Sequence, residues 1–258
     1  SIDKYTNDGK RSGAYEWGVY CIIPYVSVNF EGDYTSVSTV IHELGHAMHS
    51  YYSDKNQTYT NSSYPIFLAE IASTVNEVLL NEYMIKNAKT NEEKLFYITK
   101  FLDEFRATVY RQTQFAEFEY LVHEMDRDEV PLTTEKLYET YYDLNKLYYK
   151  NIVNDEEIGY EWSRIPHFYT QFYVYKYATG FSCAIKIAND ILNKKEGALE
   201  NYLTFLKSGG SDYPLNILAK CGIDMRKTTV IDDAVKMFKD RLIMAKKLRE
   251  EMIKNGSK

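Results

Sequence analysis

The chain has 258 residues, 45% of them apolar and 26% charged, a balance typical of a globular protein able to bury a full core. Its formal net charge of −6 argues against nucleic acid and anionic membrane surfaces as main partners. No apolar run is long enough to span a bilayer, and no signal peptide is visible. Cys21, Cys183 and Cys221 form no disulfide framework, so we expect buried thiols in a reducing compartment, the cytoplasm.

The N-terminal part of the chain has the composition of extended structure. Residues 13–30 are rich in β-branched and aromatic side chains, and Pro24 interrupts the run. Because proline removes a donor from a β-ladder, we expect an edge strand or an irregular hairpin here. An edge strand could pair with an extended peptide, whereas a hairpin could only shield a helical core. The sequence supports both interpretations equally.

From residue 33 onward the pattern is helical. The first helix is expected to begin among Thr35, Ser36 and Ser38, any of which can cap it, and to end near Tyr52. A polar loop follows. Pro65 then begins a second helix, at a position that proline favours.

The rest of the chain is also predicted to be helical, with Gly209-Gly210-Ser211 as its clearest turn. No repeat, low-complexity tract or linker interrupts the pattern. We therefore predict one mainly α domain over residues 1–258, with a small β-hairpin or edge strand near the N-terminus. The further helices are predicted at 92–126, 133–152, 167–194, 196–207, 213–221 and 229–254.

The segment His42-Glu43-Leu44-Gly45-His46 predicts a metal site. On a helix, histidines spaced i and i+4 project from one face toward one point. Neutral imidazole is a preferred Zn²⁺ ligand, and two imidazoles supply half of a tetrahedral shell. Glu43 could reach water at the metal without occupying the metal, which suits a general base. The alternative is a solvated His-Glu-His turn at the surface.

Catalytic zinc takes a third protein ligand and keeps one position for water. His49 shares the helix face of His42, but a straight helix carries it about 10 Å further along the axis, so we expect a core or supporting histidine. Glu70 lies in an apolar stretch, where a metal would offset the cost of burying its carboxylate. Antiparallel packing of two connected helices would bring it opposite the histidines. Glu77 either orients a histidine N–H or is solvated.

These residues together resemble the thimet oligopeptidase (M3) family of zinc peptidases, and most of all its oligoendopeptidase F branch. The resemblance begins with His42–Ser50 and Phe67–Ser73. Further similar segments follow the family's order and span nearly the whole chain. They are residues 9–15, 111–119, 165–169, 173–180 and 209–211.

The resemblance implies a mostly helical, zincin-like fold with two lobes around a deep channel. It implies one Zn²⁺ per chain at the channel floor and cleavage of internal bonds in short peptides. Carried over by position, His42, His46 and Glu70 are the zinc ligands, and Glu43 is the catalytic base.

The same resemblance points to a second group of residues. His167 matches a histidine that binds substrate or stabilises the transition state, and tyrosines shortly after it hydrogen-bond the oxyanion. Tyr169, Tyr173 and Tyr177 are spaced by four and would share one face of a helix. We favour Tyr173 and Tyr177 as the phenols that reach the cleft. The alternative is an aromatic stripe that belongs to the core.

Members of this branch are commonly about twice as long as this chain and have a helical N-terminal lobe as the other channel wall. Since the chain opens on Ser1 rather than methionine, we expect the C-terminal, metal-binding part of such an enzyme, with a missing N-terminal lobe as its partner. The expected function is zinc-dependent endopeptidase activity on short peptides. The rival is a non-catalytic, zinc-stabilised peptide-binding module or an inactive fragment. Glu43 argues against it, as does a ligand set of three rather than the four of a structural site.

Overall fold

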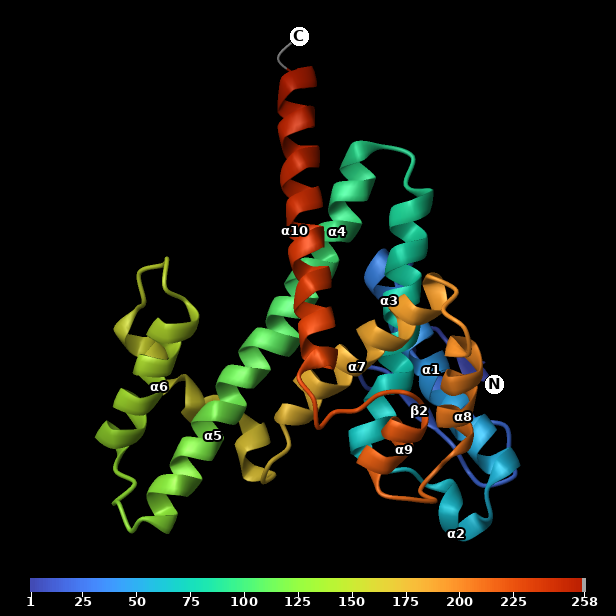
Figure 1. Cartoon of the computed structure of the whole chain (residues 1–258), viewed down its shortest axis with the longest axis horizontal. Helices are drawn as coiled ribbons and strands as arrows, with labels where there is room; N and C mark the ends of the chain where they lie inside the picture. Colours follow the sequence, from blue (N-terminus) through green and yellow to red (C-terminus); the bar gives the residue numbers. More distant parts are fainter. Residues whose placement is uncertain (257–258) are drawn as a thin grey trace. The chain divides into compact units, whose positions relative to one another are not determined.

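The computed structural model describes residues 1–256 and shows a mainly α chain with one small sheet near its N-terminus, which confirms the predicted fold class (Figure 1). The chain divides into two compact units, which we call unit 1 (Ser1–Leu102 with Gly180–Lys258) and unit 2 (Asp103–Thr179). Within the described residues, no helix is both long and apolar enough to cross a membrane.

Most helices of the described chain belong to unit 1. Two of the helices, α4 and α7, have residues in both units. The α-helices of unit 1 are α1 (Tyr34–Asn56), α2 (Tyr59–Ser62), α3 (Ile66–Asn87), α8 (Ala198–Lys207), α9 (Pro214–Lys220) and α10 (Thr229–Gly256). The two shared helices are α4 (Asn91–Phe105) and α7 (Tyr175–Leu192).

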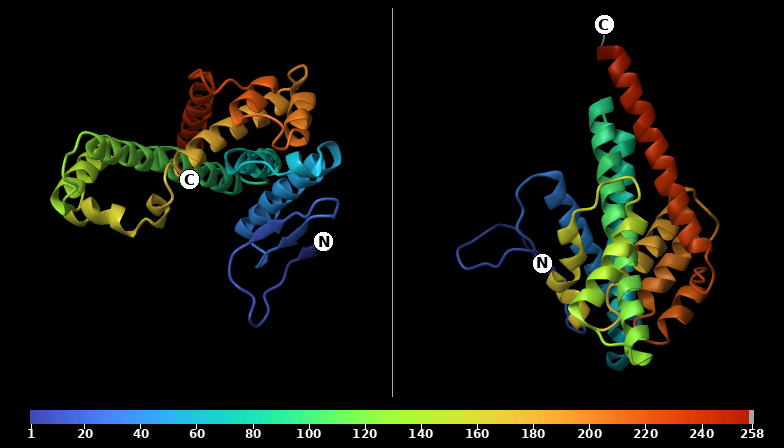
Figure 2. Two further views of the ribbon diagram at one scale, coloured as in Figure 1. Left: turned by 90° about the horizontal axis from the view of Figure 1, so that it is seen from below. Right: turned by 90° about the vertical axis from the view of Figure 1, so that its left-hand side faces the viewer.

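The sheet has three short strands, β1 (Ile2–Asp3), β2 (Tyr15–Trp17) and β3 (Tyr25–Ser27), in the order β1-β3-β2. Strand β3 pairs in parallel with β1 and antiparallel with β2, so β2 and β3 form the predicted hairpin and β2 lies at an edge. Pro24 stands just before β3 and therefore removes no donor from the ladder. Figure 2 shows the sheet beside α1.

Helix α1 begins one residue before the earliest predicted start. Its cap is Asp33, whose Oδ1 accepts hydrogen bonds from the N–H and the hydroxyl of Ser36, at 2.7 and 2.6 Å. The prediction of a cap at Thr35, Ser36 or Ser38 was wrong, because a carboxylate at residue 33 already satisfies the first free N–H groups.

Helices α1 and α3 pack against each other at Gly45. A Cβ atom on Gly45 would lie 2.5 Å from the Cα of Ser73 and 2.7 Å from the carbonyl oxygen of Ala72. Such distances are too short for any side chain, so only glycine allows the two backbones to come this close. This packing sets the distance between the histidine-bearing helix and Glu70.

The main core of unit 1 lies between α3, α7, α8 and α9, and includes Leu68, Ile71, Phe205 and Leu218. A smaller cluster joins α3, α4 and α10. The predicted turn at Gly209 is present: Gly209 has φ +50°, and the Gly210 N–H donates to the carbonyl of Asn61.

The prediction of three buried thiols is correct for Cys183 and Cys221 and wrong for Cys21. Cys21 is exposed in the loop of the β2–β3 hairpin and has φ +65°. A hairpin loop at the surface offers no core in which its thiol could be buried.

Unit 2 is built on the helices α5 (Arg111–Arg127) and α6 (Thr134–Tyr148), preceded by a π-helical turn (Arg106–Tyr110). Two 3₁₀ segments follow, Glu156–Arg164 and Pro166–Tyr169. The buried Glu161 ties the first of them to both helices, since its carboxylate accepts from Arg111 and from the Tyr141 hydroxyl at 2.6 Å each.

The predicted helix over 167–194 begins later than expected. The chain turns at residues 170–174, where Phe172 has φ +50°, and α7 starts only at Tyr175. A left-handed residue cannot continue an α-helix, so Tyr169, Tyr173 and Tyr177 do not share one helical face.

Candidate metal centre

Three donor atoms from α1 and α3 converge in unit 1. Nε2 of His42 and Nε2 of His46 lie 3.5 and 3.8 Å from Oε2 of Glu70, and donor atoms of the three residues lie within 4.8 Å of one another. Tetrahedral zinc with bonds of 2.0–2.1 Å would separate its ligand atoms by roughly 3.3 Å. The chemistry of the donor set therefore suits zinc, and the two distances to Glu70 are close to this separation.

The second ring nitrogen of each histidine is already engaged. Nδ1 of His42 lies 3.2 Å from Oε2 of Glu77, and the ring of His46 donates to the carbonyl of Ala69. Ligating histidines usually donate their second N–H to such a carboxylate or carbonyl, which fixes the ring and directs the other nitrogen at the metal. The orienting contact predicted for Glu77 is thus present, and the two imidazoles face Glu70 with their remaining nitrogens.

The electrostatics of the centre follow from these contacts. Burial lowers the pKa of His42, but the hydrogen bond and charge of Glu77, followed by the charge of Glu70, outweigh it and raise the pKa to about 9. Burial and the neighbouring charge of His42 lower the pKa of His46 to about 4. The acidic surroundings of this centre thus favour a cation, and a bound metal would replace the proton on His42.

Glu43 lies on α1 between the two histidines and is 6% exposed. Burial raises the pKa of its carboxyl, and the charges of Glu70 and Glu77 add to the rise, against the lowering effect of His42. The backbone N–H of Glu16, in β2, donates to this carboxylate. A carboxylate with a raised pKa beside a metal centre can take up a proton and release it.

His49 is separate from the centre, as predicted. It is fully buried, stacks on the ring of Tyr64 at 3.6 Å and lies 5.0 Å from the ring of Phe205. Burial, with a smaller effect of His46, lowers its pKa to about 3, so the ring is neutral. His49 is therefore a core residue, through which α1 packs against Tyr64 and Phe205.

The second predicted group forms a cluster in unit 2. The His167 ring lies 5.6 Å from that of Tyr173 and 5.9 Å from that of Tyr177, whose hydroxyl is 3.3 Å from His167 Nε2. The rings of Tyr173 and Tyr177 are also 5.6 Å apart. Tyr169 is 90% exposed, so the structure brings together the three residues named by the prediction and leaves Tyr169 outside.

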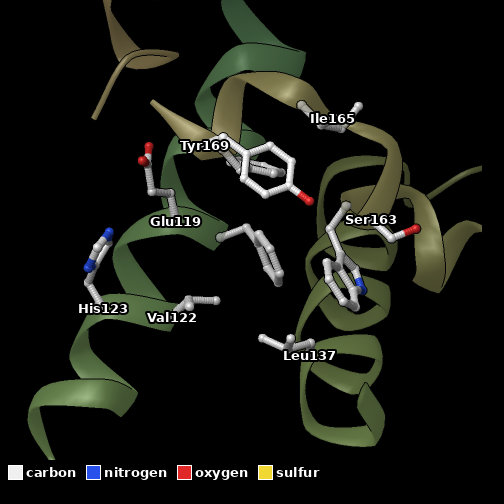
Figure 3. A pocket seen from close by; sticks show the side chains of 10 residues that line it. Glu119, Val122, His123, Leu137, Ser163, Ile165 and Tyr169 are labelled. Carbon is white, nitrogen blue, oxygen red and sulfur yellow. The ribbon is translucent and has the colours of Figure 1, made fainter. Parts of the chain in front are cut away.

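The loop that carries Tyr173 is held by Glu119, a buried residue of α5. Its Oε1 accepts a 2.7 Å hydrogen bond from the N–H of Phe172, the residue in the left-handed conformation. Glu119 also lines a largely apolar pocket of unit 2, of about 210 Å³, together with His123 and Leu137 (Figure 3). Figure 3 shows Tyr169 and Ile165 at one end of the pocket, on the segment above the two helices that carry Glu119 and Leu137.

Several contributors to the metal centre were missed from sequence. The carbonyl of Ala69 has no side-chain signature, and neither has the N–H of Glu16. Ser73, whose Oγ lies 3.4 Å from Oε2 of Glu70, stands three residues after Glu70, a spacing that places both on one helical face. Ser73 is the one contributor that helical spacing could have revealed.

Comparisons with known proteins show the family of the chain. The sequence profile of Peptidase family M3 matches residues 1–237. The chain belongs to peptidase family M3. Within it, the chain is 47% identical over 242 residues to oligopeptidase PepF of Bacillus subtilis (strain 168), a match that covers 93% of this chain and 36% of that protein. It is 45% identical to the plasmid-borne oligoendopeptidase F of Lactococcus lactis subsp. cremoris, covering 97% of this chain and 42% of that protein.

The fold is shared with solved structures of the M3 family. A crystal structure of oligoendopeptidase-F from Enterococcus faecium superposes with a TM-score of 0.77 at 46% identity, over 84% of this chain and 40% of that chain. The chain thus spans about two fifths of the length of its M3 relatives. The predicted resemblance to the oligoendopeptidase F branch is confirmed.

Proposed function

We propose that this chain is the metal-binding catalytic part of a zinc-dependent endopeptidase that hydrolyses internal bonds of short peptides. The convergence of His42 Nε2, His46 Nε2 and the Glu70 carboxylate supports this function. A set of three ligands suits a catalytic zinc with one position for water, whereas structural sites take four. One Zn²⁺ per chain is expected.

Bound zinc supplies Lewis acidity: it lowers the pKa of water at the site and polarises the peptide carbonyl. Glu43 accepts the proton of the attacking water and later delivers it to the leaving amine. Its burial favours this exchange, because a raised carboxyl pKa brings the proton affinity of the base closer to what both steps require. Glu77 and Ala69 hold the imidazoles in the orientation that ligation needs.

The roles of His167, Tyr173 and Tyr177 are a second part of the proposal. In it, a phenol or the imidazole of this cluster donates a hydrogen bond to the oxyanion of the transition state. Two observations support this part: the three side chains cluster within unit 2, and the Tyr177 hydroxyl already pairs with His167.

The substrate is proposed to lie along β2. This strand is at the edge of the sheet, and its Glu16 N–H faces Glu43. An extended peptide can add to such an edge through main-chain hydrogen bonds. The partner of this part is proposed to be an N-terminal lobe, which would account for the greater length of its relatives, and the proposed location is the cytoplasm.

Glu43→Gln tests the mechanism. The variant is expected to bind zinc as the unaltered chain does and to lose hydrolysis of an internally quenched peptide by about 10²–10⁴-fold, the usual contribution of a general base. Zinc content is measured in parallel, and a chelator should abolish the activity of the unaltered chain. Full turnover by Glu43→Gln would contradict the mechanism. Stoichiometric zinc without hydrolysis in the unaltered chain would instead favour the non-catalytic, peptide-binding module.

A further inference from the structure

A cavity of about 630 Å³ lies in unit 1 at the end of β2. Its walls come from β2 and the segment that follows it, from the C-terminal half of α1, and from α2 with the residues that lead into α3. The side chains that determine its chemistry are Glu16, Trp17, Tyr20, Asp54, Tyr59 and Tyr64.

The lining of this cavity combines four aromatic side chains with two carboxylates and contains no lysine or arginine. Oε1 of Glu16 is buried and has no hydrogen-bond partner of its own among the described residues, although the Ser50 side chain hydrogen-bonds the same carboxylate. A carboxylate oxygen in this state is costly unless a donor arrives. Aromatic faces and carboxylates both attract cations, and together they select a positively charged group over a neutral one.

The walls are held in place by contacts behind them. Tyr64 stacks on the buried His49 at 3.6 Å, and its hydroxyl lies 2.9 Å from that of Ser50. The backbone of Cys21 and the side chain of Ser62 hydrogen-bond the carboxylate of Asp54. The Tyr64 ring and the Asp54 carboxylate are therefore held in place before any ligand binds.

Helix α1 and strand β2, which meet at the cavity, indicate which residue of a bound peptide would enter it. Ser50 stands four residues after His46 on α1, which corresponds to about 6 Å along the helix axis. Successive residues of an extended peptide are about 3.3 Å apart, so the cavity lies roughly two residues from the metal centre. If the peptide pairs antiparallel with β2, its amino-terminal side lies over the C-terminal end of that strand, where the cavity opens.

We propose that this cavity is a substrate subsite that takes a lysine or arginine side chain about two residues to the amino side of the scissile bond. This inference rests on the proposed function, since it assigns a specificity to that peptidase site. The cation would approach Asp54 and lie in the field of the Glu16 carboxylate, with its aliphatic stem against the aromatic rings.

Peptide binding to the zinc-loaded Glu43→Gln chain tests the subsite independently of catalysis, because this variant is expected not to cleave the peptide. Fluorescence anisotropy would compare the affinities of labelled peptides that differ only at the residue two positions to the amino side of the scissile bond. That residue is lysine, arginine, norleucine or glutamate. We expect the lysine or arginine peptide to bind about tenfold more tightly than the norleucine peptide, as one charge-assisted hydrogen bond would give. The affinities of the lysine and arginine peptides determine which of the two cations binds more tightly.

Asp54→Asn and Glu16→Gln, added to the Glu43→Gln chain, should each reduce this ratio toward one, and Asp54→Asn should leave the norleucine affinity and zinc content the same. Glu92→Gln, which changes an exposed carboxylate of α4 outside the cavity, should leave the ratio unaltered. Equal binding of the lysine and norleucine peptides would overturn the subsite, as would the absence of peptide binding or a preference that survives both substitutions.

The two proposals fail in different ways. Cleavage by the unaltered chain without any preference for a cationic residue would refute the subsite and leave the peptidase function standing. A cationic preference in binding, without cleavage by the unaltered chain, would support the subsite and contradict hydrolysis by this chain.

Discussion

The two histidine-bearing clusters of this chain are built in different ways. The candidate metal centre of unit 1 stands on two regular helices, α1 and α3, and its two histidines follow helical spacing. The cluster of unit 2 stands on a 3₁₀ segment, a turn and the first residues of α7. In the first cluster the backbone is regular, and a close approach of two helices is enough to bring the side chains together. In the second, an irregular backbone brings the rings together.

This difference extends to what supports each cluster. The metal centre depends on a glycine, because Gly45 has no side chain and so lets α1 approach α3 closely. The unit 2 cluster depends on a buried carboxylate, because Glu119 holds the N–H of the left-handed Phe172. Four experiments, in order of decreasing expected effect, test whether this contrast holds.

The largest effect is expected from removing the third ligand. Glu70→Ala should lower zinc affinity by more than about 100-fold and abolish peptide hydrolysis, since two imidazoles alone hold zinc poorly. Glu77→Gln is the matched variant on the same helix and should cost about 10–100-fold in affinity, because it only orients His42. Zinc titration with a competing chelator measures both. An equal loss of zinc affinity in the two variants would contradict the assignment of Glu70 as a zinc ligand.

A smaller effect is expected from the cluster of unit 2. Tyr177→Phe keeps the ring and removes the hydroxyl that pairs with His167, so kcat should fall by about 10²-fold with little change in zinc content. Tyr169→Phe is the control, because Tyr169 is 90% exposed and lies outside the cluster. Steady-state kinetics on a quenched peptide measure the two variants. An equal effect of both substitutions would remove the basis for assigning a role to the cluster.

The helix contact beneath the metal centre can be tested without touching a ligand. Gly45→Ala should lower the free energy of unfolding by about 1–3 kcal/mol, because the new methyl group meets the backbone of α3. Gly180→Ala is the control, since a Cβ there meets other atoms only at 3.9 Å or more. That control should be neutral or slightly stabilising in a helix. Denaturant unfolding of the metal-free chains provides the comparison.

The last test concerns the neutral imidazole that supports α1. The pKa of His49 is about 3 in the folded chain and about 6.5 in an unfolded one. The unfolded chain therefore binds the proton first as the pH falls, and stability is lost from about pH 6.5 downward, by at most about 1.4 kcal/mol per pH unit. His49→Phe keeps an aromatic ring against Tyr64 and should flatten this dependence in metal-free protein. An unchanged slope would mean that His49 does not titrate this way.

The sequence by itself determined the parts of this protein that follow a regular period. The spacing of His42 and His46 predicts a shared helix face, and the apolar surroundings of Glu70 single out its carboxylate. Most helices lie where periodicity places them, because burial of one face dominates their formation.

Only the tertiary structure decided the rest. The Asp33 cap, the turn around Phe172 and the exposure of Cys21 depend on local backbone conformations that periodicity does not encode. The hydrogen bond from His46 to the Ala69 carbonyl, and the one from the Glu16 N–H to Glu43, involve main-chain groups that every residue possesses. Such groups leave no mark on the sequence, so their pairing becomes visible only when the elements that carry them pack together.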